Sequence, residues 1–68
     1  MTALSQSPRY RILWILANHG GMMERSRLRR RMAMRYALLN PILEELVRDG
    51  RTKITVTMQR DIISLISG

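Results

Sequence analysis

The chain has 68 residues, which is enough for one compact domain, and its 12 Lys and Arg against 5 Asp and Glu give a formal net charge of +7. It contains no cysteine, and this excludes disulfides, thiolate metal sites and cysteine nucleophiles. The single histidine, His19, has no carboxylate at metal-ligand spacing, so we expect no metal, no cofactor and no enzymatic activity.

The first predicted helix follows a flexible tail of residues 1–7. Ser7 is a favoured N-cap residue, and Pro8 suits the first helical position, where its missing N–H would be unpaired in any case. The helix should run to about His19, where two consecutive glycines end it. Apolar residues occupy more than one side of this segment, so we expect it to be sandwiched within the core.

Two further helices are predicted before residue 50. A second, short helix is expected from about Glu24 to Met32, with Leu28 and Met32 facing inward. A third lies between roughly Arg35 and Asp49 and is ended by a glycine. The apolar stripe of this third helix consists of Leu39, Ile42, Leu43 and Leu46.

Pro41 leaves the start of the third helix open, because a proline inside a helix removes a backbone hydrogen bond and kinks the chain. On one interpretation, the helix begins near Arg35 and contains Pro41. On the other, Asn40 and Pro41 are themselves the N-cap and first-turn residues of this helix. The second helix would then run on from Arg25 towards Leu38.

After residue 50 the apolar period changes to two, which is typical of a half-buried strand. Ile54, Val56 and Met58 alternate with polar residues and predict the first strand. A turn is expected at about residues 57–61, and residues 62–67 form the returning strand. The predicted order is therefore helix, helix, helix, hairpin, in the α+β class.

From Ile12 onward, this order and spacing resemble the winged helix-turn-helix domains of MarR- and PadR-type bacterial and archaeal regulators. The resemblance rests on the apolar first helix with its two glycines, on Leu28 and Met32, and on the run 39–50, which looks like a recognition helix leading into a wing. It implies three helices and a C-terminal two-stranded β-hairpin wing over residues 8–68, with DNA as the partner.

Arginines gather in and just after the second helix: six of the eleven residues from Arg25 to Arg35 are arginine, and none is acidic. Like charges at this density repel, and cations are disfavoured in the first turn of a helix, so we expect phosphate groups at this site. A merely solvated helix face is the alternative. The predicted contacts to the nucleic-acid backbone are Arg25, Arg27, Arg29, Arg30, Arg31, Arg51, Lys53 and Arg60.

The docking mode of the family places the N-terminal part of the third helix in the major groove. The resemblance therefore implies Arg35, Tyr36 and Asn40 as base-reading candidates, with guanine suited to Arg35 and adenine to Asn40. Gln59 and Arg60 would form the wing tip and reach a minor groove or a backbone.

The last strand carries apolar side chains on both faces, and one face needs a cover. We expect a homodimer or a partner protein on this surface, which consists of Ile62, Ile63, Leu65 and Ile66.

The leading functional interpretation is a double-stranded DNA-binding module, a small transcriptional regulator. One alternative is a winged helix that binds proteins, with the arginines only solubilising. The other is a basic protein that associates with RNA or the ribosome. The longest apolar run, residues 12–17, is far shorter than the roughly 20 residues of a membrane span, and no secretory signal pattern is visible. We therefore expect a cytoplasmic protein that does not bind membranes.

Overall fold

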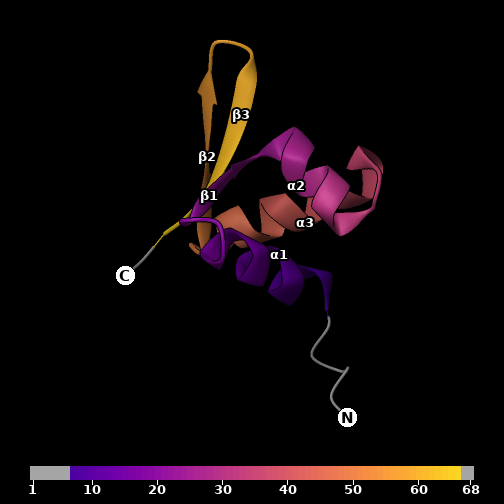
Figure 1. The fold of residues 1–68 in the computed structure, drawn as a ribbon. Helices are drawn as coiled ribbons and strands as arrows, with labels where there is room; N and C mark the ends of the chain where they lie inside the picture. The colour runs from indigo at the N-terminus through magenta and orange to yellow at the C-terminus, as the bar shows by residue number, and fades with distance from the viewer. Residues whose placement is uncertain (1–6, 67–68) are drawn as a thin grey trace.

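The computed structural model describes residues 7–66 and contains three α-helices and a three-stranded antiparallel sheet (Figure 1). The class is therefore α+β, as the periodicities predicted. The elements are α1 (Pro8–Ala17), β1 (Met22–Glu24), α2 (Arg25–Met32), α3 (Tyr36–Arg48), β2 (Thr52–Thr57) and β3 (Arg60–Leu65). Most of the predicted N-terminal tail, and the last residue of the predicted returning strand, lie outside the described residues.

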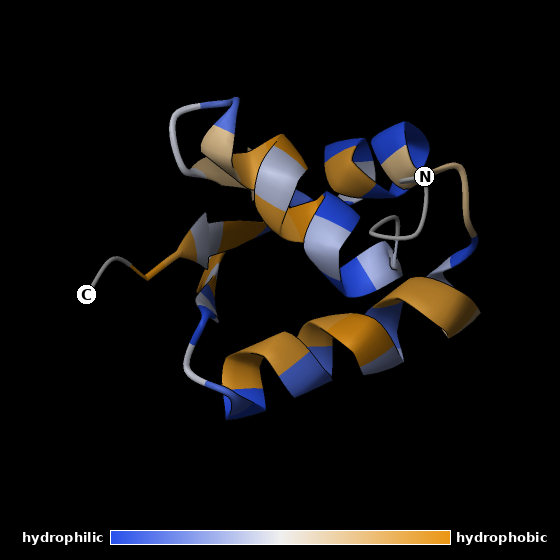
Figure 2. Cartoon of the chain, turned by 90° about the horizontal axis from the view of Figure 1, so that it is seen from below, coloured by the Kyte–Doolittle hydropathy of each residue, from blue (hydrophilic) through white to orange (hydrophobic). Residues whose placement is uncertain are grey.

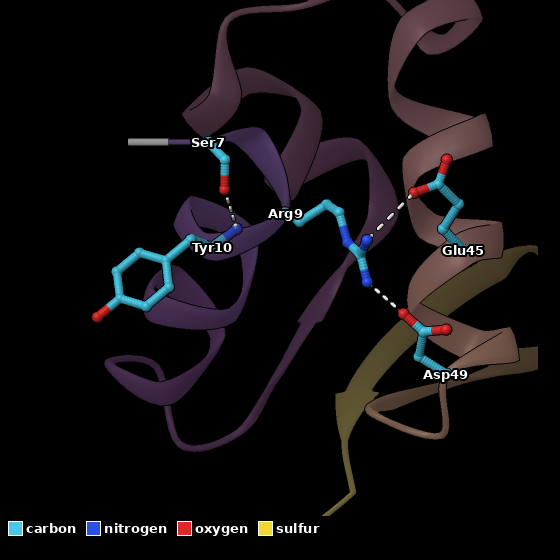
Figure 3. Close-up of polar contacts among 5 residues, drawn as sticks. All are labelled: Ser7, Arg9, Tyr10, Glu45 and Asp49. Carbon is cyan, nitrogen blue, oxygen red and sulfur yellow. Dashed lines mark hydrogen bonds and ion pairs between the residues drawn. The ribbon is translucent and has the colours of Figure 1, made fainter. Parts of the chain in front are cut away.

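The start of α1 follows the local chemistry that the sequence indicates. The Ser7 side chain accepts a hydrogen bond from the backbone N–H of Tyr10 at 3.3 Å, and Pro8 occupies the first turn (Figure 3). The helix ends at Ala17, two residues earlier than predicted. Gly21 then adopts a φ of 88°, which L-residues with a side chain rarely adopt, and this lets the chain reverse into β1.

The alternative start of the third helix at Asn40 is wrong. Arg35 is the N-cap residue of α3, and Pro41 lies within the helix. The second helix ends at Met32, where Ala33 takes a left-handed conformation with φ 56° and ψ 43°. The chain therefore turns between α2 and α3 well before Asn40, and α3 contains Pro41 in its interior.

Strands β2 and β3 form an antiparallel hairpin, but the sheet contains a third strand, β1, which the prediction lacked. The sheet order is β1-β3-β2, so β3 is the central strand, with β1 on one side and β2 on the other. Met23 of β1 pairs with Ile63, and both side chains are buried. A strand of three residues is too short to show a period of two, which is why the sequence pattern did not reveal it. The hairpin turn is also tighter than expected, since it consists of Met58 and Gln59 alone.

The core lies between the three helices and one face of the sheet. It consists of aliphatic and methionine side chains: Ile12, Ile15, Leu16, Met23, Leu28, Met32, Leu39, Leu43, Leu46 and Ile63. Figure 2 shows hydrophobic residues recurring along α1 and α3 and hydrophilic ones through α2. The expectation that α1 is sandwiched is wrong for the isolated chain, because only its inner side is covered and Tyr10 and Trp14 are 54% and 60% exposed.

Candidate nucleic-acid interface

Three arginines form all the ion pairs found within residues 7–66. Arg9 of α1 contacts both Glu45 and Asp49 of α3, the former at 3.6 Å (Figure 3). Arg25 Nη2 lies 3.3 Å from Asp61 Oδ2. The fourth pair joins Arg60 Nε to Glu24 Oε2 at 3.1 Å, between neighbouring strands. Glu44 is therefore the one acidic side chain of the described chain that has no cationic partner.

The remaining basic side chains have no carboxylate partner within the described part of the chain. They are Arg11, Arg27, Arg29, Arg30, Arg31, Arg35, Arg48, Arg51 and Lys53. Eight of these nine side chains are exposed and Arg29 is half-buried, so most of the unpaired positive charge faces solvent. Such an excess produces a positive surface potential that attracts polyanions.

Arg25 differs from the other arginines of α2, because it connects secondary-structure elements instead of pointing outward. Its side chain is only 22% exposed, and Nη1 donates to Asn40 Oδ1 of α3 at 2.7 Å while Nη2 faces Asp61 of β3. Its Nε is buried without a hydrogen-bond partner. The predicted phosphate contact of Arg25 would therefore compete with a contact that holds α2, α3 and β3 together.

The same contact bears on the predicted role of Asn40. A bidentate contact with adenine uses both the oxygen and the nitrogen of the amide group. In the structure, the Asn40 oxygen already accepts from Arg25, and the side chain is half-buried. Asn40 would have to release Arg25 in order to read adenine in this way.

The half-buried Arg29 and the exposed Arg30 and Arg31 point in three directions around α2. Leu28 and Met32 face the core, so the 3.6-residue period places Arg30 on the opposite, solvent side. Arg29 lies over the Tyr36 ring of α3, with 5.4 Å between the guanidinium carbon and the ring centroid. Arg31 contacts His19 Nε2, on the side of α1. The arginines therefore stay on one helix, but they do not form one flat patch.

The N-terminal ends of α2 and α3 meet the start of β3 around one hollow. Its volume is about 260 Å³, and its lining consists of Glu24, Arg25, Ser26, Tyr36, Gln59, Arg60 and Asp61. Arg35, the residue before α3, is exposed beside Tyr36. The predicted base-reading residues Arg35 and Tyr36 thus lie at one end of α3, close to Arg29 and to the hairpin.

At the hairpin, the predicted tip shifts by one residue. The tip consists of Met58 and Gln59, while Arg60 is the first residue of β3 and pairs with Glu24. Met58 is 97% exposed with φ 50°, a conformation unfavourable for a residue with a side chain. The alternating pattern suggested that Met58 continues the strand, so its place at the tip was missed. Arg51 and Lys53 are exposed near the start of β2.

The predicted partner surface on the last strand is mostly covered within the chain. Ile63 is fully buried, and Ile62 and Leu65 are half-buried. Since β3 pairs on both sides, it offers no free edge to a partner. Ile66, just after the strand, remains substantially exposed.

Across residues 7–66 we find no cluster of acidic or imidazole side chains that could hold a metal ion. Of the helices described, none has the length and hydropathy needed to cross a bilayer. No family model, curated protein sequence or solved structure matches the chain.

Proposed function

We propose that the chain is a double-stranded DNA-binding module with a winged helix-turn-helix arrangement, and that it acts as a small transcriptional regulator. In this proposal, the N-terminal end of α3 enters the major groove, α2 lies across the backbone, and the β2–β3 hairpin is the wing.

One observation carries the proposal: apart from Arg25, the basic side chains of α2, and Arg35 after it, have no carboxylate partner within residues 7–66. The acidic residues that do form ion pairs serve Arg9, Arg25 and Arg60. Arg27 and Arg30 are exposed on α2, and Arg35 is exposed at the start of α3. These cations flank the end of α3 that the docking mode would insert, where they could bind phosphates on both sides of a groove.

The salt dependence of binding to a labelled 20-base-pair duplex tests this proposal directly. Each phosphate contact that is lost should lower the slope of log affinity against log salt by about 0.9. We expect the double variant Arg27→Ala/Arg30→Ala to weaken binding to all sequences and to flatten this slope. Arg48→Ala is the control, because Arg48 is also exposed without an ion pair but lies at the other end of α3.

The outcomes separate the alternatives. The double variant removes two charges and the control removes one. A loss of binding free energy in the double variant that is no more than twice the loss in the control means that only net charge matters, and it overturns the docking mode. Tighter binding to RNA than to duplex DNA at the same salt concentration supports an RNA-associated protein instead.

A protein-binding winged helix is the second candidate, and the surface of α3 favours it. Leu38 is 58% exposed in the first turn, next to the exposed Ala37. Such an apolar turn suits a protein partner better than a base edge. The absence of binding to both DNA and RNA at low salt would favour this second function over the first.

A further inference from the structure

Helix α1 carries two apolar stripes, and the fold covers only one of them fully, since in the second only Leu13 packs against the core. Ile12, Ile15 and Leu16 enter the core. The second stripe consists of Tyr10, Leu13, Trp14 and Ala17 and has the spacing i, i+3, i+4, i+7 that defines one side of a helix. Tyr10, Trp14 and Ala17 are exposed, and Leu13 is half-buried. We call these four residues the outer stripe.

The outer stripe holds side chains that are common at protein interfaces. Trp14 is the single tryptophan of the chain, and Tyr10 is one of its two tyrosines. Neither contributes to the core, which contains no aromatic residue among the described positions. Trp and Tyr are enriched among the residues that dominate binding energy, because each buries a large area with few rotatable bonds.

Two hollows flank the outer stripe, and they differ in character. Leu13 and Ala17 border a hollow of about 570 Å³, whose apolar wall is completed by Leu65 and Ile66 and whose rim carries Asp49, Gly50 and Arg51. On the other side, Trp14 borders a smaller hollow of about 350 Å³ with Arg11, His19 and Arg31. One molecule thus presents both a projecting indole and an apolar recess beside it.

We propose that the outer stripe is the interface of a homodimer, in which Trp14 of each copy enters the apolar hollow of the other. A two-fold interface requires that one surface contain both complementary features, and the ridge and the recess lie side by side on α1. The proposal does not depend on DNA binding.

The charges around the outer stripe favour one orientation of the two copies. Arg11 and Arg31 lie on one flank, so antiparallel α1 helices would bring these cations against each other. With parallel helices, the flank of one copy that carries Arg11 and Arg31 faces the other flank of its partner copy. On that flank, the carboxylates of Glu45 and Asp49 form ion pairs with Arg9. We therefore place the two-fold axis along the α1 helices.

The size of the surface predicts a weak dimer. A standard interface buries about 800 Å² on each partner, and one fully buried aromatic side chain supplies about 150–250 Å². Two half-exposed aromatics and a recess fall short of that area. Because each copy carries +7, added salt should strengthen the dimer, whereas it weakens binding to a polyanion.

Trp14 is itself the probe for the test. We expect sedimentation velocity to show a monomer–dimer equilibrium between about 1 µM and 1 mM. Over the same concentrations, the fluorescence emission of Trp14 should shift to the blue as its indole leaves water. Ala17→Arg places a charge in the outer stripe while keeping the probe, and a cation suits the C-terminal end of a helix. This variant should remain monomeric, with red-shifted emission, at concentrations where the parent chain dimerises.

Ala37→Arg is the matched control, since it adds the same charge at an exposed alanine of α3 and should leave the dimer unchanged. Far-ultraviolet circular dichroism of both variants checks that they fold. A strict monomer at the highest concentration overturns the proposal. So does a dimer whose Trp14 emission stays constant, or one that Ala17→Arg and Ala37→Arg affect equally.

Discussion

The guanidinium group of Arg25 lies 3.3 Å from the carboxylate of Asp61, so the first residue of α2 is tied to the second residue of β3. The same group donates to Asn40 in the middle of α3 at 2.7 Å. A single, largely buried side chain therefore connects the three elements that meet around the proposed interface.

Asp61→Asn should lower the free energy of unfolding by about 1–2 kcal/mol, because it removes a charge-assisted contact from a guanidinium that is largely withdrawn from water. Urea denaturation followed by circular dichroism measures the loss. Glu24→Gln is the control, since it breaks the more exposed pair with Arg60 and should cost less than about 0.5 kcal/mol. Equal losses in the free energy of unfolding would show that the Arg25–Asp61 pair stabilises the fold no more than the Arg60–Glu24 pair does.

The role of Arg25 could not be predicted from the sequence, for a physical reason. Within the chain, Arg25 is the first member of a run of like charges, and the pattern alone indicates a solvated or phosphate-binding face. Its partners Asn40 and Asp61 lie 15 and 36 positions away. Only the tertiary fold brings them to the start of α2, whereas the exposed Arg27 and Arg30 are where the local pattern placed them.

The fold was predicted best where local chemistry acts alone. The Ser7–Pro8 start of α1 and the order of the elements follow from capping residues and apolar periods. The strand β1 was missed because its three residues form only through pairing with β3. The exposed outer side of α1 was missed because an apolar stripe looks the same in sequence whether the same chain or another molecule covers it.

Ala33→Gly should stabilise the protein by about 1 kcal/mol. Ala33 ends α2 in the left-handed conformation, which costs an L-residue about 1–2 kcal/mol and glycine almost nothing. Thermal unfolding should show a higher Tm. Ala37→Gly provides the comparison, because Ala37 is also exposed but lies within α3, where glycine should cost about 1 kcal/mol. A lower Tm for both variants would argue that Ala33 is not held in this conformation in solution.

Asn40→Asp should change stability and DNA binding in opposite directions. A carboxylate at this position would accept from Arg25 with a charge-assisted bond, and the free energy of unfolding should rise by about 0.5–1 kcal/mol. If α3 enters a groove as proposed, the added negative charge should weaken duplex binding at least several-fold. Denaturation and fluorescence anisotropy measure the two effects separately. Unchanged DNA affinity combined with higher stability would place Asn40 outside the interface.

Pro41→Ala should stabilise α3 by about 1–3 kcal/mol, because it restores the backbone N–H that can donate to the carbonyl of Ala37. The proline ring is exposed, so little packing is lost. Pro8→Ala is the matched control, since Pro8 lies in the first turn of α1, where the N–H has no partner within the helix. Urea denaturation of that variant should show no increase in the free energy of unfolding. If both alanine variants prove less stable than the parent, restriction of the unfolded chain by proline outweighs the missing hydrogen bond, and Pro41 carries no net cost in α3.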